Sequence, residues 1–149
     1  MYYVVPIQPQ VADTNLFGHI DDRSYMRWFD RARMPFYTEL FPGFHLKPHG
    51  LAVVKATEEY FFEIDVDAKL EARVWVARIG NKSFDVVQEL WRVLDGREEC
   101  CATSRCVFST INFDTHRSEP LTEHFLAVLR KYYDDREPTP APKRDEIDV

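Results

Sequence analysis

The sequence predicts an α+β fold, in which an antiparallel β-sheet packs against one long amphipathic helix. Three observations indicate this fold. An early segment has apolar residues at spacings of three and four, four later segments are rich in strand-forming residues, and short turn sequences lie between those segments. Consecutive hairpins build an antiparallel sheet, and one face of such a sheet can bury the apolar stripe of a helix.

The long helix is expected to begin near Tyr25. Its apolar positions form one stripe: Tyr25, Trp28, Phe29, Ala32, Phe36 and Leu40. Asp21 or Asp22 can cap its first turn. Pro35 lacks a backbone N–H and disfavours helical geometry at the residue before it, so we expect a kink or a second short helix at this point.

The strands are expected before and after this helix. Residues 2–11 are rich in strand formers, but Pro6 and Pro9 restrict them to the edge of a sheet. Four further strands are expected over residues 51–64, 69–79, 84–94 and 97–112. The sequences Gly80–Ser83 and Asp95-Gly96 are typical of hairpin turns, which pair the strands on either side in antiparallel fashion.

The C-terminal part is expected to hold a short helix and a tail. Ser118 or Thr122 can cap the helix, and Arg130 and Lys131 suit its last turn because they complement the helix dipole. From residue 134 onward the chain contains three prolines and nine charged residues. We therefore expect one domain over residues 1–133 and a disordered tail over residues 134–149.

The composition limits the partners. The 149-residue chain has a formal net charge of −6, which disfavours nucleic acid as a main partner because phosphate binding depends on clustered Lys and Arg. No run approaches the roughly 20 apolar residues that a membrane-spanning helix needs. The N-terminal sequence MYYVVPIQPQ has neither a basic segment nor a long apolar one, so we expect a cytoplasmic location.

Cysteine and histidine spacings do not indicate a metal site. The chain has three cysteines: Cys100, Cys101 and Cys106. They include no CxxC pair, and we interpret them as reduced, buried thiols rather than as disulfides or zinc ligands. His45 and His49 are four residues apart, but Pro48 between them disrupts the helical geometry that a metal pair would use. We expect neither a metal nor another cofactor.

Polar groups are concentrated in the stretch VADTNLFGHIDDRSYMRWFDRAR over residues 11–33, which leads into the long helix and includes its first turns. Gly18 serves either a turn with positive φ or a close approach of the backbone to a ligand. Unpaired N–H groups at a helix start suit a carbonyl oxygen that becomes negative during a reaction, so Gly18, His19 and Asp22 are candidates for an oxyanion site. His19 is either a general base or a hydrogen-bonding spacer.

Several motifs follow one another along the chain: Asp13-Thr-Asn15, Gly18-His19-Ile20-Asp21-Asp22, Tyr25, Ala32-Arg33, EEYFFEIDVD, ARIGNKSFDVVQEL and CATSRCVFSTINFDTHRSEPL. Their order resembles the acyl-CoA thioesterases of the 4-hydroxybenzoyl-CoA thioesterase type, which have the hotdog fold. In that family the first motifs usually read Asp-Thr-Asp, Gly-His-Val-Asn-Asn, then Tyr and Ala-Arg. The resemblance covers residues 3–130.

This resemblance implies a curved antiparallel sheet wrapped around the long helix. It also implies a homodimer or homotetramer that binds an acyl thioester at the subunit interface, with coenzyme A or an acyl carrier protein as the thiol. The implied activity is hydrolysis of the thioester to a free acid and a thiol. In the family the second Asp of Asp-Thr-Asp acts as the nucleophile or general base.

Asn15 stands at the position of this catalytic carboxylate. An amide cannot accept a proton near neutral pH, and a positioned general base contributes about 10² to 10⁴ in rate. The NH₂ of an amide can instead donate to the substrate carbonyl while its oxygen orients a water. A subgroup that includes the thioesterases of enediyne polyketide synthases is similar in having Asn here, with a Tyr and an Arg on the helix.

The resemblance to this subgroup makes Asn15, Tyr25 and Arg33 the candidate catalytic residues. Two structural interpretations remain beside it. Tyr25 can be a core aromatic residue, and Arg33 can be the charge partner of Asp30 or of a carboxylate on the sheet. The resemblance favours the catalytic roles over these two structural interpretations.

Two questions stay open: which residue replaces the catalytic carboxylate as the base, and which reaction the protein catalyses. Glu58, Glu59 and Glu63 lie on the strand expected to pass nearby, and one of them can supply the base. A hydratase or dehydratase of the same fold is an alternative, since its signature Asp-x-Asn-Pro-x-His-x-Asp resembles DTNLFGHID. Leu16 in place of Pro, and one extra residue before His19, count against it. A non-catalytic module that binds acyl thioesters is the third hypothesis.

Overall fold

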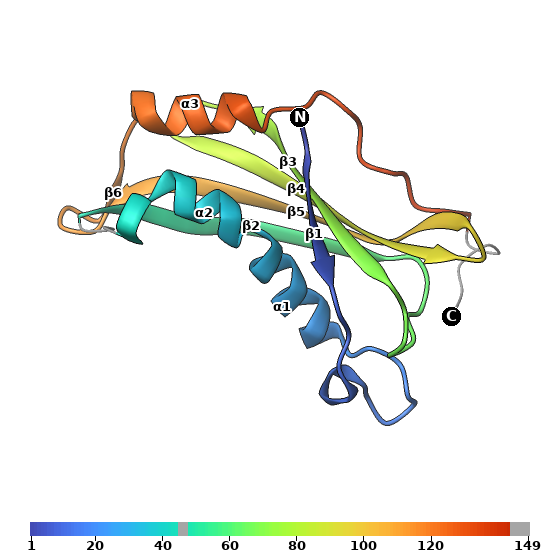
Figure 1. Ribbon diagram of the computed structural model, residues 1–149. Helices are drawn as coiled ribbons and strands as arrows, with labels where there is room; N and C mark the ends of the chain where they lie inside the picture. The colour runs from blue at the N-terminus through green and yellow to red at the C-terminus, as the bar shows by residue number, and fades with distance from the viewer. Residues whose placement is uncertain (45–47, 144–149) are drawn as a thin grey trace.

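The computed structural model describes residues 1–44 and 48–143, and its main feature is one antiparallel sheet (Figure 1). The strand order is β1-β3-β4-β5-β2, and a short strand β6 pairs with β5. The strands are β1 (Tyr3–Ile7), β2 (His49–Tyr60), β3 (Leu70–Ile79), β4 (Ser83–Leu94), β5 (Arg97–Asn112) and β6 (Arg117–Ser118). They confirm the α+β prediction and the two expected hairpins, β3-β4 and β4-β5.

Two strands end earlier than expected. β1 stops at Ile7, before Pro9, which has no N–H for a ladder hydrogen bond. β2 ends at Tyr60 rather than at residue 64. The N–H groups of Phe61 and Phe62 both donate to the carbonyl oxygen of Cys101, at 2.7 and 3.3 Å, so the regular ladder does not continue past this point.

The predicted helix is present as two helices, α1 (Asp22–Ala32) and α2 (Met34–Leu40). The break lies at Arg33, and Pro35 occupies the first turn of α2, where its missing N–H needs no partner. Asp21, not Asp22, is the N-cap of α1. Its carboxylate accepts a hydrogen bond from the N–H of Ser24 at 2.8 Å, which lowers the pKa of Asp21 below its ordinary value.

The remaining helical segments are α3 (Glu123–Lys131) and two single turns, η1 (Val11–Asp13) and η2 (Pro42–Phe44). Thr122 caps α3, because its hydroxyl accepts a hydrogen bond from the N–H of Phe125 at 3.1 Å. Arg130 and Lys131 lie in the last turn, as the sequence predicts. Over the residues described, every helix is too short or too polar to cross a membrane.

The core lies between the sheet and α1 with α2, which pack on one face of it (Figure 1). All residues of the predicted helical stripe are at most 6% exposed. The facing residues of β3 are Leu70, Ala72, Val74 and Val76. The three cysteines are buried free thiols, as expected. Cys101 belongs to this core, whereas its neighbour Cys100 lies outside the core cluster.

The segment after α3 covers part of the opposite face of the sheet. Residues 134–143 contain no helix or strand and run along the side of the sheet away from α1 (Figure 1). The guanidinium of Arg136 lies 5.1 Å from the ring centroid of Trp75, which is fully buried, and the N–H of Thr139 donates to Glu89 at 2.6 Å. Residues 144–149 of the predicted tail lie outside the described residues.

Candidate functional site

A cavity of about 440 Å³ lies beside the start of α1. Its walls come from the loop before α1, from the first turns of α1, and from the end of β2 with the residues that follow. The lining residues are Asn15, Phe17, His19, Ile20, Asp22, Tyr25, Tyr60, Phe61, Phe62 and Glu63. The cavity therefore brings together most of the predicted site residues and combines a polar group with an aromatic wall.

Asn15 organises the loop that forms one side of the cavity. Its side-chain oxygen Oδ1 accepts hydrogen bonds from the N–H of Phe17 at 2.9 Å and from the N–H of His19 at 3.2 Å. Its own N–H donates to the carbonyl of His19, and its carbonyl accepts from the N–H of Gly18. Both lone pairs of Oδ1 are thus engaged, so this oxygen is not free to orient a water. The NH₂ group is the available end of the side chain.

The same contacts limit which backbone groups can hold a substrate. Gly18 has φ +78°, a conformation that favours glycine, and open space surrounds the position of a Cβ atom. The N–H groups of Gly18 and His19 both serve the loop. The N–H of Asp22, in the first turn of α1, has no acceptor within the helix. Among the predicted oxyanion donors, Asp22 is therefore the one whose backbone N–H remains available.

A buried carboxylate fixes the loop to α1. Asp13 is 8% exposed and accepts hydrogen bonds from the N–H of Gln10 at 2.7 Å, from the hydroxyl of Ser24 at 2.9 Å and from Arg27 at 3.3 Å. The carbonyl of Asp13 accepts from the N–H of Asp21. These bonds hold the polar loop against the first turn of the helix.

Glu63 is the predicted glutamate that lines the cavity. Its Oε2 lies 2.9 Å from Nε2 of His19. Glu58 instead accepts a hydrogen bond from the hydroxyl of Tyr60, and Glu59 lines a separate hollow beside Pro138. The alternation of side chains along β2 places Glu58 and Glu59 on opposite faces.

Tyr25 lies in the cavity wall and is only 6% exposed. Its ring contacts the ring of Trp28 at a centroid distance of 5.6 Å and that of Tyr60 at 4.8 Å. Burial raises the pKa of Tyr25 well above its ordinary value, so the phenol stays protonated and can donate a hydrogen bond. Tyr25 is thus both a packed aromatic residue and a member of the site.

Arg33 does not line this cavity. It lies at the opposite end of α1, an 11-residue helix and therefore about 16 Å long. Each of its three guanidinium nitrogens has a partner: Nε donates to Tyr37 at 2.8 Å, Nη1 to Gln88 at 2.7 Å, and Nη2 to Asp30 at 3.3 Å. This arrangement matches the structural interpretation, in which Arg33 is the charge partner of Asp30. Arg33 also bonds to the sheet, through Gln88 on β4.

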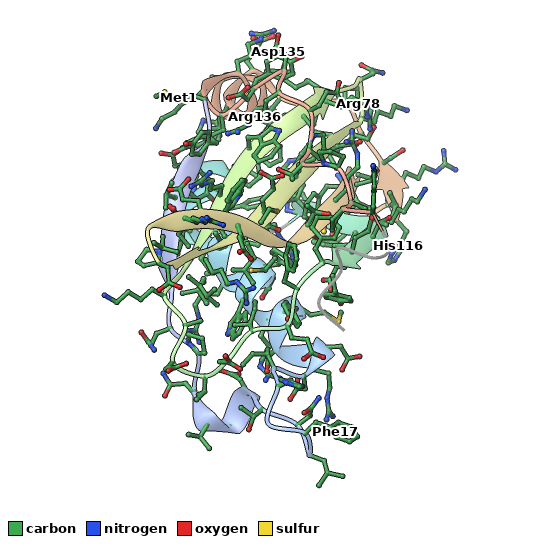
Figure 2. The ribbon with its side chains drawn as sticks, turned by 90° about the vertical axis from the view of Figure 1, so that its right-hand side faces the viewer. Met1, Phe17, Arg78, His116, Asp135 and Arg136 are labelled. Carbon is green, nitrogen blue, oxygen red and sulfur yellow. The ribbon has the colours of Figure 1, made fainter. Side chains whose placement is uncertain are left out.

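Sequence reasoning missed the aromatic wall of the cavity. Phe17, Tyr60, Phe61 and Phe62 line it, although Phe17 is also 78% exposed and lies at the tip of its loop (Figure 2). The run YFF at residues 60–62 was the available signal. Such a run is equally typical of a buried strand, so it does not by itself indicate a ligand wall.

Of the two histidines considered above as metal ligands, His49 lies within the described residues. His49 pairs with Glu119 across β2 and the segment after β6. His45 lies outside the described residues. Within residues 1–44 and 48–143, no three His, Cys, Asp or Glu side chains are grouped closely enough to hold a metal ion.

The sequence matches the family model of the thioesterase-like superfamily over residues 9–129, and the chain therefore belongs to this superfamily. No curated protein matches the sequence. Among solved structures, a predicted thioesterase from Bacillus stearothermophilus is similar, with 24% identity, coverage of 92% of this chain and 100% of the other, and a TM-score of 0.83.

Two further solved structures are similar. The dynemicin thioesterase has 20% identity over 90% of this chain and 99% of its own, with a TM-score of 0.78. A 1,4-dihydroxy-2-naphthoyl-CoA thioesterase from Synechocystis has 13% identity over 87% of this chain and 96% of its own, with a TM-score of 0.76. Together with the sheet and helices described above, these similarities confirm the predicted hotdog fold.

Proposed function

We propose that the protein hydrolyses an acyl thioester to a free acid and a thiol in the cavity beside α1. The observation that carries this proposal is the convergence of an amide donor, a helix N-terminus and a His–Glu pair on that one cavity. Membership of the thioesterase-like superfamily supports the same reaction class. The cavity lining includes both polar and aromatic groups, as a polar thioester with an apolar acyl chain requires.

The donors in this proposal hold the thioester carbonyl oxygen. The NH₂ group of Asn15 and the N–H of Asp22 donate to this oxygen, which becomes negative when water adds to the carbonyl carbon. The positive end of the α1 dipole favours that charge. One well-placed donor of this kind lowers the barrier by about 2.7 to 4 kcal/mol. The protonated hydroxyl of Tyr25 is a further donor at the same cavity.

Arg33 has a supporting role in this proposal. Its bonds to Tyr37 and Gln88 connect the end of α1 to α2 and to β4, and they hold the helix in place on the sheet. The role that the resemblance gives Arg33, stabilisation of developing negative charge, stays a prediction.

The proposed substrate is an acyl-CoA or acyl-carrier-protein thioester with an apolar or aromatic acyl group. The cavity volume of about 440 Å³ lies within the range of small-molecule sites, about 300 to 1,000 Å³. Phe17, Phe61 and Phe62 give it an aromatic wall. The structure of the dynemicin thioesterase concerns polyene binding, and the relative from Synechocystis acts on a naphthoyl-CoA. A polyene and a naphthoyl group are both flat and unsaturated, and such a wall accommodates groups of this kind.

We also propose that two copies form the working enzyme through β2. This 12-residue strand is at the end of the sheet and pairs with β5 on one side only. Val53 and Val54 on this edge are 55% and 60% exposed, and an uncovered apolar edge strand favours pairing with another strand. Light scattering is expected to show a homodimer, which Val54→Asp shifts toward the monomer. The cytoplasmic location stays a prediction from the N-terminal sequence.

A panel of aliphatic and aromatic acyl-CoA and acyl-carrier thioesters tests the proposed reaction. Release of thiol can be followed with a thiol reagent because the three cysteines of the protein are buried. Mass spectrometry should show the free acid. Conversion of trans-2-enoyl thioesters to 3-hydroxyacyl thioesters would instead indicate a hydratase. Tight binding without any turnover would indicate a non-catalytic binding module.

A further inference from the structure

His19 and Glu63 form a side-chain pair at the cavity wall. Nε2 of His19 lies 2.9 Å from Oε2 of Glu63, and the two side chains are 39% and 40% exposed. His19 comes from the loop before α1 and Glu63 from the segment after β2, so the fold brings them together from different parts of the chain. Both line the cavity that Asn15 also lines, and both remain open to water.

The contact to Glu63 determines which nitrogen of His19 is available for chemistry. A carboxylate can only accept a hydrogen bond, so Nε2 carries the proton and Nδ1 carries the lone pair. Within residues 1–44 and 48–143, Nδ1 has no hydrogen-bond partner in the protein. An imidazole that is held by a carboxylate on one nitrogen and free on the other has the arrangement of a general base.

We propose that His19 is the catalytic base for the attacking water and that Glu63 is its positioning residue. This inference rests on the proposed thioesterase function. Nδ1 takes a proton from water as the water oxygen bonds to the acyl carbon. The carbon–sulfur bond then breaks, and the imidazolium returns the proton to the departing thiolate. The products are the acid and the thiol, and His19 is neutral again, so no further reactant is needed.

This pair replaces the carboxylate that Asn15 cannot supply. The two functions of the usual aspartate position are divided in this chain: Asn15 provides a donor for the carbonyl, and His19 provides the base. The other predicted glutamates do not compete for the role. Glu58 is bonded to the hydroxyl of Tyr60, and Glu59 lies at a different hollow.

Charged and titratable groups surround the pair. Asp22, Tyr25 and Tyr60 line the same cavity, and Nη1 of Arg92 donates to the backbone carbonyl of Glu63 at 2.6 Å. The contact with Arg92 holds the backbone of Glu63, and it thereby helps to keep the carboxylate of Glu63 against His19.

The test compares hydrolysis of acyl-CoA by the wild type, His19→Ala, Glu63→Gln and the control Glu59→Gln. His19→Ala should lower kcat about 10² to 10⁴-fold, with partial rescue by added imidazole. Glu63→Gln should lower kcat less than His19→Ala does and should leave KM unchanged, because Glu63 orients the base and not the substrate. Glu59→Gln should match the wild type. Circular dichroism and unfolding curves of each variant serve to show that the fold is retained.

The outcomes separate this inference from the function on which it rests. Wild-type hydrolysis with unchanged kcat in both His19→Ala and Glu63→Gln would overturn the assignment of the pair and leave the thioesterase function intact. A loss in His19→Ala that imidazole does not rescue, together with a change in KM rather than in kcat in Glu63→Gln, would also overturn it. Absence of hydrolysis in the wild type would reject the proposed function itself.

Discussion

Nη1 of Arg33 donates a hydrogen bond to Oε1 of Gln88 at 2.7 Å, and Nε2 of Gln88 donates in turn to the carbonyl of Phe29 at 2.6 Å. Gln88 is fully buried on β4, and Arg33 is 8% exposed at the end of α1. The amide of Gln88 therefore connects a buried cation to the helix backbone. This connection fixes the end of α1 on the sheet, and it explains why a guanidinium is tolerated in the core.

Changing either residue of this pair should mainly reduce stability. Gln88→Ala leaves a buried guanidinium N–H and a buried carbonyl without partners, so the free energy of unfolding should fall by about 2 to 5 kcal/mol. Arg33→Lys should also be destabilising, because one ammonium cannot reach Tyr37 and Gln88 together in the guanidinium geometry. Urea unfolding measures both changes.

The exposed partner of Arg33 provides the matched control. Asp30 is 66% exposed, and its ion pair with Arg33 is a surface contact, so Asp30→Asn should change stability by less than about 1 kcal/mol. If Arg33→Lys unfolds like the wild type but loses kcat, Arg33 is catalytic, as the resemblance predicts, and the supporting role is rejected.

Variants of Asn15 separate its effect on the loop from its effect on catalysis. Asn15→Asp keeps an oxygen for the N–H groups of Phe17 and His19, so its stability should equal that of the wild type. Asn15→Ala loses both bonds and should destabilise the loop. In Asn15→Asp the NH₂ donor is lost, so kcat should fall about 10² to 10³-fold. A rise in hydrolysis instead would indicate that the native chain lacks a working base, which favours the binding-module hypothesis.

Much of the fold could be predicted because its signals are local. The spacing of apolar residues in α1, the proline in α2 and the Asp95-Gly96 turn each act over a few neighbouring residues. The structure confirms these elements. The end of β2 could not be predicted as well, because it depends on where the pairing with a distant strand becomes irregular. That strand is β5, and the irregularity lies at Cys101.

The candidate site could be predicted only in part, because its geometry is not local. The motif order grouped Arg33 with Asn15, but the length of α1 places them at opposite ends of the helix. The sequence also could not choose among the three glutamates. Whether Glu63 reaches His19 depends on how the chain turns after β2, and this turn is determined by packing rather than by residue type.

The buried thiols should make the free energy of unfolding fall at alkaline pH. Burial raises the pKa of Cys100 and of Cys101 to about 12, whereas a thiol in the unfolded chain has a pKa of about 8.5. Above pH 8.5 the unfolded chain loses these protons and the folded protein keeps them. Each thiol then lowers the free energy of unfolding by about 1.4 kcal/mol per pH unit until the folded pKa is reached.

Urea unfolding between pH 7 and pH 10 measures this dependence. The double variant with Cys100→Ala and Cys101→Ala removes both groups, and its stability should decline less steeply with pH than that of the wild type. Cys106→Ala serves as the comparison variant, because it removes the third buried thiol and keeps Cys100 and Cys101. Identical slopes for the wild type and the double variant would show that these thiols do not control alkaline stability.

The C-terminal segment should be ordered over the sheet up to residue 143. The guanidinium of Arg136 lies between the rings of Tyr2, at 4.7 Å, and Trp75, at 5.1 Å, on the side of the molecule where Met1 also lies (Figure 2). The N–H of Thr139 donates to the carboxylate of Glu89 at 2.6 Å. A cation over aromatic rings is worth about 0.5 to 2 kcal/mol, so Arg136→Ala should loosen this segment.

Amide hydrogen exchange and tryptophan fluorescence report on this segment. In the wild type the amide of Thr139 should be protected, and in Arg136→Ala it should exchange faster while the fluorescence of Trp75 shifts to the red. Glu137→Ala, at an exposed position of the same segment, should leave both signals unchanged. If the amide of Thr139 exchanges at the unprotected rate in the wild type, the disorder predicted from the prolines and charges is correct. Trp75 would then be accessible to solvent on the outer face of the sheet.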